Sequence, residues 1–252
     1  MDFTVKDSIV RKIWGKADTI LFIFAGASAE FTLNRAVDWL YFTGRLPADP
    51  LGRLFSTVAY SREIIFSEQD AAMRSIDHIT AIHKGVEVNR GAQIPDEAYL
   101  EVLYMLIDYS IRAFELMERK LSRAEQEEVF DVFYRVGKRM ELRGLAHNYK
   151  TYLNDREKQL REGLYYSRFT PDLFKQYKKH LGPTRYLVLR QAQALVAPVQ
   201  ISQKLGFARI KWLLPVVYTY KFSRLLRLQN LLKLAVLPPA YVAQVHELDT
   251  PR

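Results

Sequence analysis

Residues 17–42, ADTILFIFAGASAEFTLNRAVDWLYF, place apolar side chains on almost every side of a predicted helix. Such a helix is typical of the middle of a fold, because it has no polar face to turn toward water. The break at residues 44–50, which contains Pro47 and Pro50, ends it. Apolar residues recur at helical spacing along most of the remaining chain, and strand-like alternation is hard to find over more than about four residues. The sequence therefore predicts an all-α protein.

Capping residues and prolines divide the rest of the chain into further helices. The expected helix starts lie at residues 51, 67, 95, 122, 149, 170 and 183. Ser122 with Glu125 three positions later forms a capping-box pair, and the helix that starts at residue 67 is closed by Gly91. A last apolar region covers residues 212–237. No internal repeat or linker interrupts this series, so one helical domain over residues 1–252 is expected.

The composition restricts the chemistry of the protein. With 252 residues and 49% hydrophobic content, the chain can bury a sizeable core. The absence of cysteine excludes disulfides, thiolate nucleophiles and cysteine-ligated zinc, iron–sulfur clusters or haem. The N-terminus does not resemble a signal peptide, and the most apolar run, residues 19–29, is shorter than the roughly 20 residues that cross a bilayer. We therefore expect a cytoplasmic protein without a transmembrane helix.

The net charge of +9 is concentrated near the C-terminus. Residues 163–246 contain thirteen Lys and Arg against one acid, Asp172, which suits an anionic membrane, phosphate, nucleic acid or an acidic cofactor. Nucleic acid ranks lower because no binding motif accompanies the charge. A predicted amphipathic helix in this part fits a peripheral membrane contact or a packed helix with a solvated cationic face. Its apolar side carries Phe222, Leu225, Leu226, Leu232 and Val236, and its basic side carries Lys221, Arg224 and Arg227.

His83 lies on a stripe that should face the interior, together with Ala72, Ile76, Ile79 and Val86. A buried imidazole needs a partner for each nitrogen, and ligation of a metal by one nitrogen is one way to supply it. A core histidine that is hydrogen-bonded to backbone is the other interpretation. His78 points about 140° away around the helix, so the two histidines are not expected to share an ion.

Two further groups of polar residues lie on predicted helices. Arg53 and Thr57, in the stretch DPLGRLFST (49–57), are four positions apart and can hold one polar group together, although a solvated pair has the same spacing. Glu30, Arg35 and Asp38 interrupt the apolar stretch at 17–42. Single buried charges are costly, so these residues are either paired or kept for chemistry, and pairing is the simpler interpretation.

The order and spacing of several short segments resemble the catalytic domain shared by bacterial latex-clearing protein (rubber oxygenase) and the fungal mycophenolic-acid-pathway oxygenase. The matching segments are AGA (25–27), DPLGRL (49–54) with Thr57, IIF (64–66), AA (71–72) and IHKGV (82–86). The resemblance is good over an oxygenase-like core at about 17–145 and poor over the basic helical part at about 146–246.

The resemblance implies an all-helical fold with globin-like packing around one buried haem b. His83 would be the axial iron ligand, with Arg53 and Thr57 beside the haem and Asp38 a candidate for proton transfer. The implied activity is dioxygen-dependent oxidation or cleavage of a C=C bond in an apolar, isoprenoid or lipid-like substrate. The alternative is a non-enzymatic helical module that binds haem, or a membrane surface through its basic C-terminal third.

Two positions depart from the family pattern. Ser56 stands where rubber-cleaving members carry a lysine just before the motif threonine. Tyr104 or a neighbour stands where many members carry a histidine in the helix after the proximal ligand. Both differences concern the reaction and the substrate rather than the fold.

Overall fold

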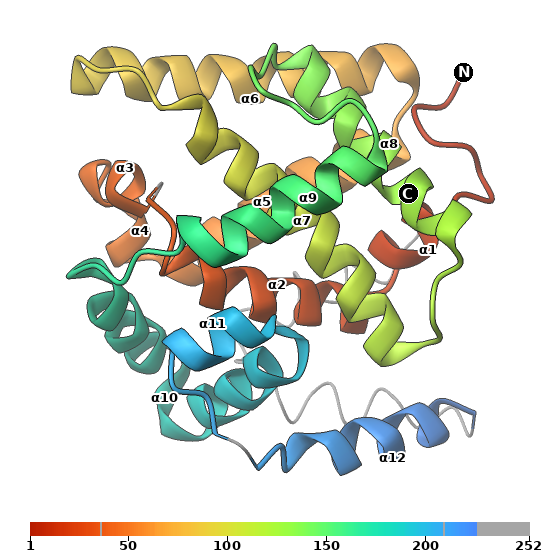
Figure 1. The fold of residues 1–252 in the computed structure, drawn as a ribbon, viewed down its shortest axis with the longest axis vertical. Coiled ribbons are helices and arrows are strands. Elements are labelled where there is room, and N and C mark those ends of the chain that lie inside the picture. The colour runs from red at the N-terminus through yellow and green to blue at the C-terminus, as the bar shows by residue number, and fades with distance from the viewer. Residues whose placement is uncertain (36, 209, 226–252) are drawn as a thin grey trace.

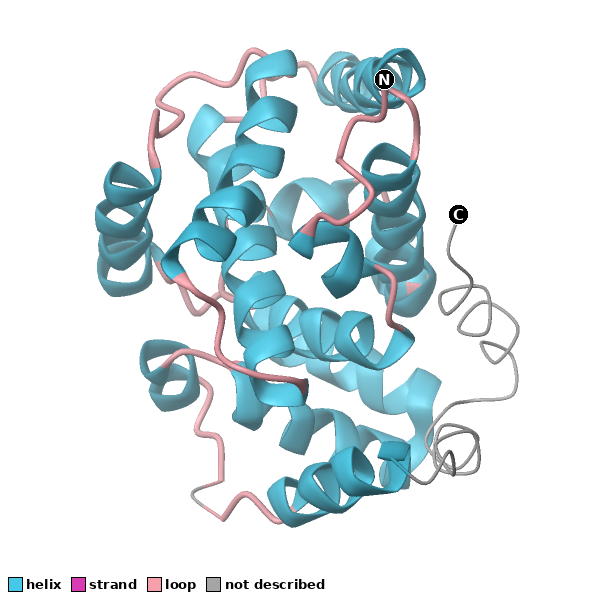
Figure 2. Cartoon of the chain, turned by 90° about the vertical axis from the view of Figure 1, so that its right-hand side faces the viewer, coloured by secondary structure: helices cyan, strands magenta, loops and turns pink. Residues whose placement is uncertain are grey.

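The computed structural model describes residues 1–35, 37–208 and 210–225, and these form helices and loops without a strand (Figure 2). The all-α prediction is confirmed. The helices are α1 (Ile9–Trp14), α2 (Ala17–Phe31), α3 (Val37–Phe42), α4 (Arg45–Ala48), α5 (Pro50–Phe66), α6 (Gln69–Arg90), α7 (Asp96–Met117), α8 (Arg123–Arg139), α9 (Tyr149–Lys158), the π-helix η1 (Gln159–Gly163), α10 (Phe169–Val196), α11 (Val199–Lys204) and α12 (Leu213–Leu225).

Helix α2 is the centre of the fold, as its sequence predicts. It crosses the middle of the molecule in Figure 1, and its most extensive contacts are with α7 and α10. Ile20, Ile23 and Phe24 belong to the main apolar core. Gly26 lets α2 and α7 approach closely, because a Cβ at this position would lie 2.2 Å from ring atoms of Tyr109. The absence of a polar face on α2 is therefore explained by neighbours on several sides.

The prediction that one helix covers residues 17–42 is wrong, because the chain turns after Phe31 and resumes as α3. The carbonyl of Leu33 accepts a hydrogen bond from the backbone N–H of Tyr165 at 2.8 Å. The N–H of Val37 bonds to the carbonyl of Asn34 at 3.2 Å, rather than to Leu33 as a continuous α-helix requires. A long-range bond to a distant segment thus replaces one helical bond, which local periodicity does not reveal.

Most of the other predicted boundaries are confirmed within a residue or two. Ser122 and Glu125 form the predicted capping box at the start of α8, and Gly91 ends α6 in the left-handed conformation, with φ of 68°. Helix α10 starts near the predicted residue 170 and contains a break at Gly182, with φ of 72°, just before the second predicted start at Pro183.

The predicted C-terminal apolar region is described only in part. Helix α12 lies within it, but the side chains of residues 222–225 and all of residues 226–252 lie outside the described part. The proposed amphipathic face of Phe222, Leu225, Leu226, Leu232 and Val236 therefore stays a prediction. None of the helices in the described ranges is both long and apolar enough to cross a membrane.

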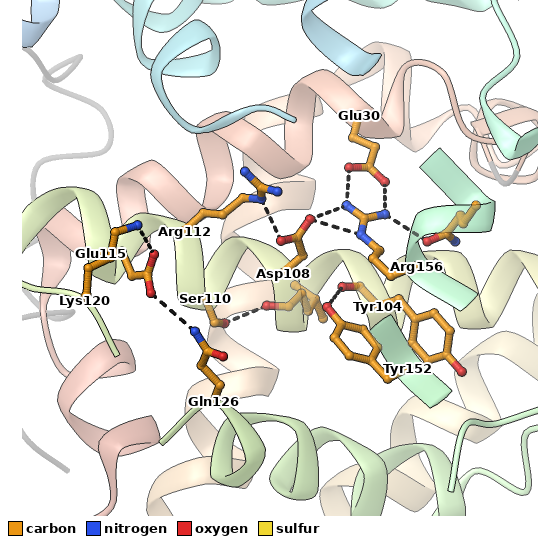
Figure 3. Close-up of polar contacts among 12 residues, drawn as sticks. Glu30, Tyr104, Asp108, Ser110, Arg112, Glu115, Lys120, Gln126, Tyr152 and Arg156 are labelled. Carbon is orange, nitrogen blue, oxygen red and sulfur yellow. Dashed lines mark hydrogen bonds and ion pairs between the residues drawn. The ribbon is translucent and has the colours of Figure 1, made fainter. Parts of the chain in front are cut away.

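The pairing predicted for Glu30 is confirmed (Figure 3). Arg156 on α9 donates to both carboxylate oxygens of Glu30, at 2.6 and 2.7 Å, and also to Asp108 on α7 at 2.9 and 3.1 Å. The side chains of Arg156 and Glu30 are only 5% and 2% exposed. This buried network joins α2, α7 and α9, and Arg156 also donates to Gln159 at the start of η1.

Candidate functional site

Two adjoining cavities are lined by residues of helices α3, α4, α5 and α6. The larger cavity, of about 870 Å³, is lined mainly by residues 39–56 and 82–94. The second, here called the core cavity, has a volume of about 250 Å³ and reaches apolar residues of α2, α7 and α8. The two cavities share seven lining residues: Trp39, Leu40, Leu46, Arg53, Ile82, His83 and Ile94. Arg53 and His83, which the sequence singles out separately, are thus brought to one wall.

His83 is positioned by the stripe that the sequence predicts on α6. Ala72 and Ile76 are fully buried, and Ile79 packs against the core. His83 follows on the same side of α6 and lines the cavities instead of the solid core. The ring of Tyr99 on α7 lies beside the imidazole, with 5.2 Å between ring centroids. Nδ1 of His83 is buried, and no described residue forms a hydrogen bond to it. The alternative of a core histidine hydrogen-bonded to backbone thus has no support from Nδ1 in the described residues.

The surroundings of His83 keep its imidazole neutral. Its pKa is lowered from the ordinary 6.5 to about 4, mainly by burial and also by the positive charge of Arg53, while Glu87 acts in the opposite direction. A neutral imidazole is the form that can bind a metal ion, because a protonated ring has no free lone pair. At neutral pH the site therefore presents an imidazole that is ready to ligate.

Arg53 and Thr57 lie close together on α5, as their four-residue spacing predicts. Asp49 caps this helix by accepting from the Gly52 N–H at 2.9 Å. The guanidinium of Arg53 donates to Ser56 Oγ at 3.3 Å, and Thr57 Oγ1 donates to the carbonyl of Arg53 at 3.2 Å. Arg53 borders both cavities, Thr57 borders the core cavity and Ser56 borders the larger one.

Asp38 does not line either cavity. It forms an ion pair with Arg90 at the end of α6. The Arg90 guanidinium also lies 4.1 Å from the centroid of the Trp39 ring, which lines both cavities. The ion pair therefore joins α3 to α6 at the edge of the site. A role for Asp38 in proton transfer stays a prediction.

Sequence reasoning missed several residues of the wall. Tyr99 borders the core cavity, and its hydroxyl donates to Glu87 at 3.3 Å. The N–H of Ile94 bonds to the same carboxylate oxygen at 2.9 Å. Trp39 and Tyr99 stand on apolar stretches that predict burial, but nothing local shows that they face a cavity rather than solid core.

Tyr104 and His78 do not contribute to the site. Tyr104 is buried, and its hydroxyl accepts a hydrogen bond from the backbone N–H of Ala146 at 2.8 Å. The ring of His78 lies 6.0 Å from that of Tyr60, and its side chain is exposed rather than directed at His83. Across the described ranges there is no group of three or more His, Asp or Glu residues that could hold a metal ion.

A family model described as "ER-bound oxygenase mpaB/B'/Rubber oxygenase, catalytic domain" matches residues 14–240. The match begins at the end of α1 and continues through the basic C-terminal part, so it covers more of the chain than the resemblance in the short motifs. No curated protein and no solved structure matches the chain.

Proposed function

Because the chain belongs to the catalytic-domain family of ER-bound oxygenase mpaB/B' and rubber oxygenase, it is an oxidoreductase of the oxygenase class, and we propose that it uses haem b. The observation that carries this proposal is His83. It is a neutral imidazole on the wall between two cavities, with a buried nitrogen that has no partner among the described residues. We further propose that the substrate is apolar, isoprenoid or lipid-like, and carries a C=C bond.

The residues around His83 fit this cofactor. The larger cavity has a volume within the roughly 300–1,000 Å³ of pockets that hold cofactors. Its walls include Trp39, Leu40, Ile82 and Val86, which suit a broad apolar ring. A porphyrin supplies four nitrogen ligands, so a site with a single histidine is sufficient for haem.

Arg53 has the chemistry to hold the charged edge of such a group. A guanidinium binds a carboxylate through two parallel hydrogen bonds, and haem b carries two carboxylates. Within the described part of the chain, Arg53 is also the only charged residue that lines the core cavity. Its positive charge lowers the pKa of His83, so it also keeps the imidazole unprotonated.

The core cavity is suited to an apolar substrate. Its lining includes Phe24, Ile64, Met105, Phe133 and Met140, whose side chains exclude water and offer no charge. Haem, when bound, supplies the activation of dioxygen for oxidation of the double bond. The chain itself would bind the apolar substrate beside His83 and shield the reacting centre from water. The residues that line both cavities place the proposed haem site beside the proposed substrate site.

Titration of the purified protein with hemin tests the cofactor. The wild type should take up haem and develop a Soret band, and His83→Ala should lose or shift it. His78→Ala removes an exposed imidazole from the same helix and should behave as the wild type. Circular dichroism confirms that each variant is folded. Equal haem uptake by folded wild type and His83→Ala would overturn the assignment of the ligand.

Oxygen consumption by the haem-loaded protein tests the substrate class. Polyisoprene and small terpenoid olefins should stimulate oxygen uptake and yield oxygenated or cleaved products, whereas saturated analogues of the same size should not. A haem-loaded protein that consumes oxygen only with polar substrates would contradict the proposed role of the core cavity.

A further inference from the structure

Helix α12 is held against the body of the protein through one side. Leu213 and Val217 are buried against Met117 of α7. The ammonium group of Lys221 donates to the carbonyl of Glu118, just past the end of α7, at 3.1 Å. A cation at this position is favoured by the partial negative charge at a helix C-terminus. These contacts fix which side of α12 turns away from the core.

The outward side of α12 is also apolar. Trp212 is 41% exposed, Val216 46% and Tyr218 61%, and Ile210 just before the helix is 78% exposed. Lys211 is the only charged residue between positions 210 and 220. A surface helix normally turns polar residues to the solvent, and grouped exposed apolar residues mark an interaction site. We call residues 210–218 the apolar ridge.

The stretch of sequence that carries the apolar ridge has charges of one sign only. From residue 173 to residue 225 the sequence contains ten Lys and Arg and no Asp or Glu. The lysines of this stretch that lie exposed on α10, on α11 or just before α12 are Lys175, Lys178, Lys179, Lys204 and Lys211. Exposed lysines of this kind attract anionic lipid headgroups.

We propose that the apolar ridge docks the protein peripherally on an anionic lipid bilayer. The combination of Trp212 and Tyr218 with exposed lysines matches the membrane interface, where amphipathic rings sit at headgroup level and cations contact phosphates. Figures 1 and 2 show α12 at one end of the long axis of the molecule, beyond helices α1 to α9, so a flat surface can reach it. The docking does not depend on the haem proposal, because the ridge shares no residue with either cavity.

Trp212 supplies a direct probe of this contact. The chain has three tryptophans, of which Trp14 is fully buried and Trp39 lines the cavities. Vesicles that contain phosphatidylserine and brominated phosphatidylcholine should therefore quench mainly Trp212 when the full chain binds. Trp212→Phe should keep most of the binding, since an aromatic side chain remains, and should lose most of the quenching. Binding should weaken in high salt and be absent with neutral vesicles.

A matched pair of valine substitutions tests the position of the surface. Val216→Ser should lower vesicle partitioning about tenfold, because an apolar side chain that would be buried in the bilayer is replaced by a polar one. Val88→Ser changes an equally apolar residue that is 80% exposed on α6 and should leave partitioning unchanged. Failure to bind anionic vesicles, or equal losses in the two variants, would overturn the proposal.

Three other outcomes would show that the apolar ridge does not dock on lipid. Binding to vesicles without quenching of Trp212 would place the lipid contact elsewhere on the chain. Binding to RNA but not to vesicles would show that the lysines serve a nucleic acid. A dimer in light scattering that Val216→Ser dissociates would show that the ridge is covered by a second copy. Each of these results would overturn docking of the ridge on lipid.

Discussion

The pH dependence of unfolding reports directly on the surroundings of His83. Its pKa is about 4 in the folded haem-free protein and has the ordinary value of 6.5 in the unfolded chain. Between these values the unfolded chain binds a proton that the folded protein does not bind. The free energy of unfolding therefore falls as the pH falls from 6.5 toward 4, and the full interval corresponds to about 3 kcal/mol.

Urea denaturation of the haem-free protein at intervals between about pH 4.5 and 7.5 measures this slope. His83→Phe keeps an aromatic ring in the wall and removes the titrating group, so its stability should fall less on acidification than that of the wild type. Contributions from carboxylates are common to both proteins and cancel in the difference. His78→Gln, which removes an exposed imidazole from α6, should follow the wild-type curve.

Parallel curves for the wild type and His83→Phe would refute the argument. They would mean that His83 titrates alike in the folded and unfolded chain, and hence that it is not held neutral by burial and by Arg53. The availability of a neutral imidazole for iron would then lose its structural basis. Haem could still bind at neutral pH, but below about pH 6.5 its binding would have to displace a proton from the imidazole.

Three other variants test the fold around the site. Arg156→Met should lower the free energy of unfolding by about 3–5 kcal/mol in urea denaturation, because it leaves the buried carboxylate of Glu30 without its cation. Arg139→Met breaks an exposed pair and should change the stability much less. Gly26→Ala should destabilise the fold by about 1–3 kcal/mol, because the added Cβ would overlap the Tyr109 ring, and a lower Tm would report this loss. Burial and the charge of Glu30 raise the pKa of Glu101 to about 7. The free energy of unfolding should therefore fall as the pH rises from 4.5 to 7, where the buried carboxyl group loses its proton. Glu101→Gln has no proton to lose and should be more stable than the wild type in urea denaturation at about pH 8.

The helices could be predicted well where their boundaries have local causes. The capping box at Ser122, the left-handed Gly91 and the break before Pro183 depend on residues within a few positions of each other. The end of α2 depends instead on a hydrogen bond between Leu33 and Tyr165, more than a hundred residues away. Periodicity carries no information about such a bond, so the predicted helix runs on to Phe42.

In the site, too, features with a local cause could be predicted, and features that depend on contacts between distant helices could not. The stripe on α6 correctly turns His83 toward the interior, and four-residue spacing correctly places Arg53 and Thr57 together on α5. The proximity of Arg53 to His83 could not be derived from either helix alone and was suggested only by the family resemblance. Trp39 and Tyr99 belong to the wall because of how α3 and α7 pack, and their local sequence predicts burial and nothing more.

Charged residues serve two different purposes along the chain. The ion pairs found in the described ranges join residues between Asp2 and Glu162, where carboxylates and cations are mixed, and several of them connect distant helices. From residue 173 to residue 225 the sequence has no carboxylate of its own, and exposed lysines there, such as Lys175, Lys178 and Lys179, are available to an outside anion. The net charge of +9 therefore does not describe the protein as a whole. It arises mainly from the part that carries the apolar ridge, while the oxygenase site lies among residues whose charges stabilise the fold.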